Sequence, residues 1–253
     1  MSENGRKLVS LVTGVLLLIS MFLVGRETAR TVSGTQVKFE SKLSNIELMS
    51  AKADKGCKNG KSPGCVVIDA GHGGDDPGKV GVNGALEKDI NLEIAELVKS
   101  YLEAEDIEVI LTRDSADGLY DADASNKKVQ DMKRRIAIIE ESAPLLTVSI
   151  HQNSYPEEYV HGAQVFYYEG SMQGKELAES IQRQMVKKLD PENKRQVKAN
   201  NSYYLLKKTS TPIVIVECGF LSNRFEAEQL CDERYREDVA WAIHMGIMQY
   251  LNK

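Results

Sequence analysis

The length and charge of the chain narrow the classes of protein to which it can belong. It has 253 residues, of which 42% are hydrophobic and 27% are charged, a composition typical of a soluble globular protein with one sizeable core. The formal net charge is -5 and no dense run of lysine and arginine occurs, which argues against nucleic acid as a partner.

The N-terminus departs from that soluble composition. Arg6 and Lys7 precede an uncharged, mostly apolar stretch of 17 residues, 8–24. Seventeen residues lie at the short end for a membrane span, and residues 25–30 offer no small-residue cleavage site. We therefore expect residues 1–25 to be an uncleaved signal anchor, with a cleaved signal peptide as the alternative. Basic residues before the apolar stretch predict that the rest of the chain lies outside the cytoplasm, membrane-anchored or secreted.

Two further regions follow the apolar stretch. Residues 26–64 are polar and lack a sustained apolar period, so we expect a linker or stalk. Residues 65–253 have the length and the apolar periodicity of a single folded domain.

The cysteines do not point to thiol chemistry. Cys57, Cys65, Cys218 and Cys231 include no pair with the Cys-x-x-Cys spacing of a zinc ribbon or a redox site. Cys57 and Cys65 flank a short loop and could form a disulfide outside the cytoplasm, with reduced thiols as the alternative. Cys218 adjoins an apolar run and is expected to pack as a small hydrophobic side chain.

Strand-like and helical periods alternate along the domain. Short apolar runs predict strands at 65–70, 107–113, 145–151, 163–168, 203–206 and 213–216. Helical spacing predicts helices at about 87–104, 127–141, 172–189 and 233–251. In the first two helices, the residues expected to face the core are Ile90, Ile94, Leu97, Leu102, Val129, Met132, Ile136 and Ile139. This alternation predicts an α/β fold, with a mainly parallel sheet of about six strands and helices on both faces.

Three of the predicted strands lead to a side chain that could bind a metal or transfer a proton. His72 follows the first strand, His151 ends the third, and Glu217 follows the last. Ligands of open α/β sheets bind in the crevice outside the carboxyl ends of the strands. We therefore expect these three side chains to converge there.

Two histidines and one carboxylate form a catalytic zinc set that leaves a position for water. Each histidine also has a plainer interpretation, His72 as part of a glycine-rich turn and His151 as a core histidine. The candidates for the third ligand are Asp69, Asp75, Asp76, Glu87 and Asp89. Glu87 is the best placed, because it opens the helix after the turn, although a carboxylate there could also simply stabilise the helix N-terminus.

Glu217 follows four β-branched residues, and a carboxylate at the end of so apolar a strand is costly to bury without a partner or a metal. We interpret Glu217 as a general base and acid that takes a proton from water and delivers it to a leaving amine. His161 and His244 are expected to be structural, with substrate contact at the rim of the site as the alternative for His161.

Several segments together resemble the zinc-dependent N-acetylmuramoyl-L-alanine amidases, and the resemblance extends over about residues 65–253. The matching segments are 67–74, 77–78, 87–88, 149–153 and 216–223. The resemblance implies that Zn²⁺ is held by His72, Glu87 and His151 and that Glu217 is catalytic. It also implies hydrolysis of the amide between N-acetylmuramic acid and the L-alanine of the stem peptide in peptidoglycan, without an organic cofactor.

Two features depart from the family pattern. Gln152 stands where the family commonly has alanine, and the helix after Arg134 and Arg135 lacks a frequent Ala-Asn pair. Some members of the family also hide the site behind an inserted helix, whereas residues 114–126 are predicted to be a polar loop.

A short amidase with an N-terminal apolar segment and no wall-binding repeat resembles the CwlD-type branch of spore-forming bacteria. That resemblance implies removal of stem peptides from spore cortex, which prepares the muramic lactam needed for germination. The alternatives are a vegetative cell-wall amidase, a zinc peptidase or deacetylase, and an inactive module that binds the wall or a partner. The expected partners are a glycan strand with its stem peptides and an exported activator protein that completes the site.

Overall fold

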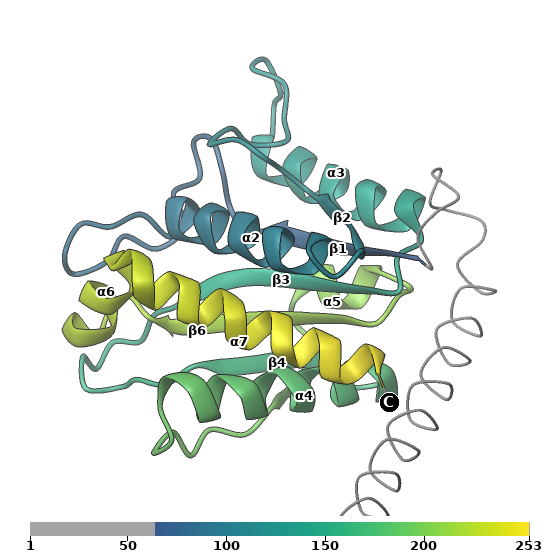
Figure 1. Ribbon diagram of the computed structural model, residues 1–253. Coiled ribbons are helices and arrows are strands. Elements are labelled where there is room, and N and C mark those ends of the chain that lie inside the picture. Colours follow the sequence, from purple (N-terminus) through teal and green to yellow (C-terminus); the bar gives the residue numbers. More distant parts are fainter. Residues whose placement is uncertain (1–63, 253) are drawn as a thin grey trace, which may run out of the picture. The chain divides into compact units, whose positions relative to one another are not determined.

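A six-stranded sheet forms the centre of residues 64–252, the part of the chain that the computed structural model describes (Figure 1). The strand order is β2-β1-β3-β6-β4-β5. The bounds of the strands are β1 Cys65–Ala70, β2 Glu108–Leu111, β3 Leu146–Asn153, β4 Gln164–Tyr168, β5 Lys198–Asn200 and β6 Ile213–Phe220.

The sheet is mainly parallel. Strand β1 pairs in parallel with β2 and β3, and β3 pairs in parallel with β6, so the carboxyl ends of these four strands lie at one edge. Strand β4 runs antiparallel to β6, and β5 is parallel to β4. The predicted α/β fold with about six strands is confirmed.

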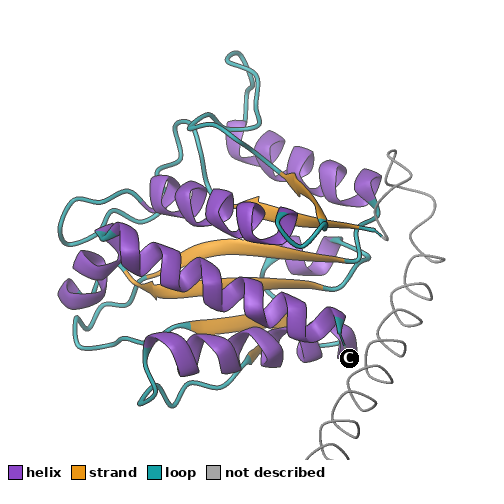
Figure 2. Cartoon of the chain, in the orientation of Figure 1, coloured by secondary structure: helices purple, strands orange, loops and turns teal. Residues whose placement is uncertain are grey.

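Helices cover both faces of the sheet (Figure 2). The larger hydrophobic core lies between the sheet and α2 (Glu87–Glu103), α4 (Met172–Leu189) and α7 (Glu233–Leu251). The smaller core lies beneath α3 (Lys127–Ser142) and α5 (Tyr204–Lys208) on the opposite face. Because neighbouring residues of a strand face opposite sides, Val66 and Ile68 join the first core and Val67 the second.

The predicted strand at 203–206 is wrong, since this run starts the short helix α5. A four-residue apolar run cannot distinguish a strand from a helical turn by periodicity alone. The side chain of Asn200 accepts hydrogen bonds from the backbone N–H groups of Ser202 and Tyr203, which turns the chain before the helix.

The prediction also lacks strand β5 and helix α6 (Arg224–Cys231). Helix α6 begins where the Asn223 side chain accepts a hydrogen bond from the backbone N–H of Glu226, a helix-start pattern that is visible in the sequence. Residues 114–126 contain neither helix nor strand, as predicted.

Most of the residues expected to face the core are buried or partly buried. Val129 is the exception, because 47% of this residue is exposed in the first turn of α3. Cys218 is fully buried in the larger core, as expected of a small hydrophobic side chain.

The predicted anchor at 1–25 and almost all of the predicted linker at 26–64 lie outside the described residues. Cys57 lies outside them too, so the alternatives for Cys57 and Cys65, a disulfide or reduced thiols, stay open, and the domain bounds stay predictions. Within residues 64–252, no helix is both long enough and apolar enough to span a membrane.

Candidate active site

His72 lies in the turn that follows β1 and has an unusual backbone conformation. Its φ is 64°, in the left-handed region that non-glycine residues seldom adopt. Its carbonyl oxygen accepts hydrogen bonds from Arg113 Nε at 2.7 Å and from Arg135 Nη2 at 2.5 Å. The preceding Gly71 leaves room for the His151 ring, which any Cβ at position 71 would overlap. Two arginines and one glycine thus hold the His72 side chain beside His151.

Arg135 is part of a buried ion network behind this turn. It contacts Asp69 Oδ1 and Asp131 Oδ2, each at 2.6 Å, and only 2% of its side chain is exposed. Thr112 and Ser149 also donate hydrogen bonds to Asp69. Burial alone would raise the pKa of Asp69, but Arg135 and these hydrogen bonds outweigh it and lower that pKa to about 2. Asp69 is therefore a charged structural residue that supports the turn.

Glu87, the first residue of α2, lies between the two histidines. Its Oε1 is 3.2 Å from His72 Nε2 and 3.0 Å from His151 Nδ1, while its Oε2 accepts a hydrogen bond from the backbone N–H of Lys79 at 2.7 Å. Burial opposes ionisation of Glu87, but the histidine contacts outweigh it and hold the pKa of the carboxyl well below its ordinary value. The other ring nitrogen of His72, Nδ1, lies 3.0 Å from Asp76 Oδ2.

These three side chains fit a zinc ion. Ligand atoms of His72, Glu87 and His151 all lie within 4.8 Å of one another. A tetrahedral zinc ion with ligands at about 2.0–2.2 Å holds its ligand atoms about 3.3–3.6 Å apart. The distances from Glu87 Oε1 to the two histidine nitrogens, 3.2 Å and 3.0 Å, are close to this spacing. A zinc-binding histidine usually has a hydrogen-bond partner, often a carboxylate, at the ring nitrogen that does not bind the metal. Asp76 occupies this position beside Nδ1 of His72.

Glu217 lies next to this group. It is the direct partner of His151 across strands β3 and β6, and 7% of the residue is exposed. Its Oε2 is buried without a hydrogen-bond partner among the described residues. Burial raises the pKa of Glu217 to about 7, with Glu87 adding to the effect and the two histidines opposing it. A carboxyl with such a pKa can both accept and donate a proton near neutral pH.

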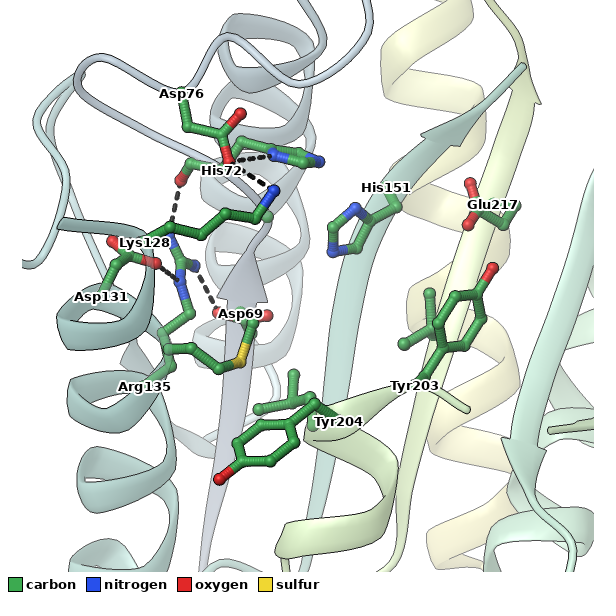
Figure 3. A pocket seen from close by; sticks show the side chains of 14 residues that line it. Asp69, His72, Asp76, Lys128, Asp131, Arg135, His151, Tyr203, Tyr204 and Glu217 are labelled. Carbon is green, nitrogen blue, oxygen red and sulfur yellow. Dashed lines mark hydrogen bonds and ion pairs between the residues drawn. The ribbon is translucent and has the colours of Figure 1, made fainter. Parts of the chain in front are cut away.

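A pocket of about 140 Å³ is lined by His72, His151 and Glu217 (Figure 3). Besides His72, His151 and Glu217, residues of α3 and the start of α5 line it, namely Lys128, Asp131, Met132, Arg135, Tyr203, Tyr204 and Leu205. The pocket opens at the carboxyl edge of the sheet, on the face that α3 and α5 cover, because His151 and Glu217 project to that face.

The other candidate carboxylates have different partners. Asp69 contacts Arg135, Asp75 contacts Lys127 at 2.6 Å, and Asp76 contacts His72 from outside the group. Asp89 is exposed on α2 and is not among the clustered side chains.

The remaining histidines lie away from the pocket. His161 is exposed in the loop before β4, where its Nδ1 is 2.9 Å from the carbonyl oxygen of Tyr159. His244 is buried in α7 beside the rings of Tyr101 and Trp241. Gln152, which departs from the family pattern, donates a hydrogen bond to Asn91 and does not line the pocket.

The sequence reasoning did not assign a role to Arg135 or to Tyr203. A signal for Arg135 is present, since it lies on the same helical face as the core residues Met132, Ile136 and Ile139, where an arginine needs a buried partner. No comparable signal marks Tyr203, because its position depends on how separate elements pack.

Comparisons with known proteins show the family of the chain. The family described as N-acetylmuramoyl-L-alanine amidase matches residues 66–249. The germination-specific N-acetylmuramoyl-L-alanine amidase of Bacillus subtilis is 36% identical over 191 residues, which cover 74% of this chain and 80% of that protein.

Two solved structures extend the similarity to the fold. The CwlD amidase of Clostridioides difficile, determined in complex with the GerS lipoprotein, is 40% identical, with a TM-score of 0.73 over 74% of this chain and 98% of that one. The amidase AmiC2 of Nostoc punctiforme is 33% identical, with a TM-score of 0.65 over 75% and 97%. The chain therefore belongs to the N-acetylmuramoyl-L-alanine amidase family.

Proposed function

We propose that this amidase is zinc-dependent and that it cleaves the bond between the lactyl group of N-acetylmuramic acid and the L-alanine of the stem peptide. The observation that carries the proposal is the convergence of four side chains. His72, Glu87 and His151 have ligand atoms within 4.8 Å of one another, and Glu217 lines the same pocket as the two histidines. Two imidazoles and one carboxylate are the donor set of many catalytic zinc sites, and they leave one position for water.

The donor atoms that would hold zinc are His72 Nε2, Glu87 Oε1 and His151 Nδ1. When bound, zinc supplies a Lewis acid that polarises the amide carbonyl and acidifies water. Asp76 orients His72 through the outer ring nitrogen, and Arg113 and Arg135 hold the backbone of the turn.

Glu217 is the proton carrier in this proposal. It takes a proton from the attacking water as the new C–O bond forms, and it returns that proton to the alanine nitrogen as the C–N bond breaks. The products are a lactyl carboxylate and a peptide with a free amino terminus. A pKa of about 7 suits both steps, because the group must gain and lose the proton in one cycle.

The direct test is digestion of purified peptidoglycan by the zinc-loaded full chain. The proposal predicts peptides that begin with a free L-alanine amino group and glycan strands that are otherwise intact. Cleavage within the stem peptide would indicate a peptidase, release of acetate would indicate a deacetylase, and no release of any product would favour an inactive binding module.

We further propose that the substrate is spore cortex and that the reaction prepares muramic lactam for germination. The similarity to the germination-specific amidase of Bacillus subtilis supports this substrate over the vegetative wall. Expression in a spore former that lacks its own germination-specific amidase should restore muramic lactam in the cortex. Normal cell separation without restored lactam would instead favour a vegetative role.

An exported partner is part of the same proposal. The relative from Clostridioides difficile was determined in complex with a lipoprotein, which supports a protein partner for this chain outside the cytoplasm. Zinc content and activity should rise when the full chain is produced together with such a lipoprotein from the same organism. Equal values with and without it would contradict a need for the partner.

A further inference from the structure

Tyr203 lies at a rigid point of the pocket wall, between β5 and α5. The Asn200 side-chain oxygen accepts hydrogen bonds from the backbone N–H of Ser202 at 2.7 Å and of Tyr203 at 2.8 Å, and from Ser202 Oγ at 3.0 Å. Because one side chain binds three donors, the backbone before Tyr203 is fixed.

The ring of Tyr203 is also held. It packs edge-to-face on Phe166 of β4, with ring centroids 5.5 Å apart, and contacts the smaller hydrophobic core. Phe166 pairs with Ile215, which lies two residues before Glu217 on the same face of β6. This packing points the hydroxyl of Tyr203 toward the carboxylate of Glu217 in the same pocket (Figure 3).

The chemistry of the two groups is complementary. Burial, and then the nearby charge of Glu217, raise the pKa of Tyr203 to about 12, so the phenol keeps its proton at neutral pH. A protonated phenol can donate a hydrogen bond to a carboxylate. Glu217 Oε2 has no hydrogen-bond partner among the described residues.

We propose that Tyr203 is a positioning residue that holds the carboxylate of Glu217, through its phenol hydroxyl, in the orientation needed for proton transfer. The inference rests on the function proposed above for Glu217. It assigns to Tyr203 no contact with the metal and no direct proton transfer.

The first test is the variant Tyr203→Phe in the zinc-loaded full chain, which removes only the hydroxyl. We expect kcat to fall about tenfold, the size of one lost hydrogen bond to a charged group, while KM and zinc content stay unchanged. Tyr168→Phe is the matched control, because Tyr168 packs against the same core without contacting Glu217. A Tyr203→Phe variant as fast as the wild type would overturn the inference.

A second test separates action through Glu217 from a general effect on the fold. Tyr203→Phe should lower kcat in the wild-type background and have no further effect in the Glu217→Gln background. The same loss in both backgrounds would show that Tyr203 acts independently of Glu217, and the inference would be wrong.

Crystal structures of the wild type and of Tyr203→Phe give a readout that does not need activity. We expect the Glu217 carboxylate to be ordered in one orientation in the wild type and to rotate or split into several conformers in the variant. An unchanged Glu217 would contradict the inference even if the proposed reaction proves correct. A wild type that cleaves no peptidoglycan would contradict the proposed reaction, and these structures would still decide the role of Tyr203.

Discussion

His151 and Glu217 are direct partners on the neighbouring parallel strands β3 and β6. Adjacent strands lie about 4.8 Å apart, so the sheet itself places a proposed metal ligand next to a proposed proton carrier. The two side chains have different surroundings. His151 has Glu87 within hydrogen-bond distance, whereas Glu217 has a buried oxygen without a partner among the described residues.

Glu217→Gln should keep zinc and lose activity. The amide has nearly the shape of the carboxylate but cannot accept and return a proton, so we expect kcat to fall at least about a hundredfold. Metal analysis should give the same zinc content as the wild type. A rate within a few-fold of the wild type would show that another group carries the proton.

The same substitution should stabilise the metal-free protein, and more so at higher pH. The pKa of Glu217 is about 7 in the folded chain and 4.5 ordinarily, so its contribution to stability is present below about pH 4.5 and is lost as the pH rises through 7. Glutamine carries no charge to bury, and the gain at about pH 8 should be on the order of 2 kcal/mol.

Thermal unfolding of both metal-free proteins at about pH 5 and about pH 8 measures this effect. The difference in Tm between Glu217→Gln and the wild type should be larger at the higher pH. A difference that shrinks as the pH rises would show that the folded chain favours the ionised carboxylate.

Asp76→Asn should weaken zinc binding although Asp76 is not a proposed ligand. Its carboxylate lies 3.0 Å from the outer nitrogen of His72, and loss of such a partner typically lowers metal affinity 10-fold to 100-fold. Competition with a chromophoric chelator measures the affinity. Asp75→Asn is the control, because Asp75 contacts Lys127 instead. Equal zinc affinities of the two variants would show that Asp76 does not support zinc binding.

Arg135→Met should strongly destabilise the fold. It leaves Asp69 charged and buried without its cation, and breaking a buried ion pair in this way costs about 3–5 kcal/mol. Arg134→Met, at the neighbouring and only partly buried position, should have little effect on urea-induced unfolding. Similar midpoints for the two variants would mean that the Arg135 network contributes little to stability.

The residues that the sequence identifies are those whose positions follow from strand ends. His72, His151 and Glu217 each follow or end an apolar run, and parallel strands bring such residues to one edge. Glu87 could be selected because it opens the helix that follows the glycine-rich turn of His72. Alternation of apolar runs likewise predicts the α/β architecture and the two long helices at 172–189 and 233–251.

The remaining features depend on packing between distant segments. Tyr203 reaches Glu217 only because α5 is a helix and its ring packs on Phe166, and a four-residue apolar run does not reveal either fact. Asp69 is a plausible metal ligand in the sequence, yet in the fold it faces Arg135, 66 positions along the chain. Sequence spacing cannot distinguish these two uses of a buried carboxylate.

Diffraction from crystals of the zinc-loaded chain, measured at the zinc absorption edge, tests the central claim most directly. The account predicts one strong anomalous peak about 2.0–2.2 Å from His72 Nε2, Glu87 Oε1 and His151 Nδ1, with Glu217 nearby and not coordinated. A zinc peak elsewhere on the chain, or no peak between these three side chains, would contradict it.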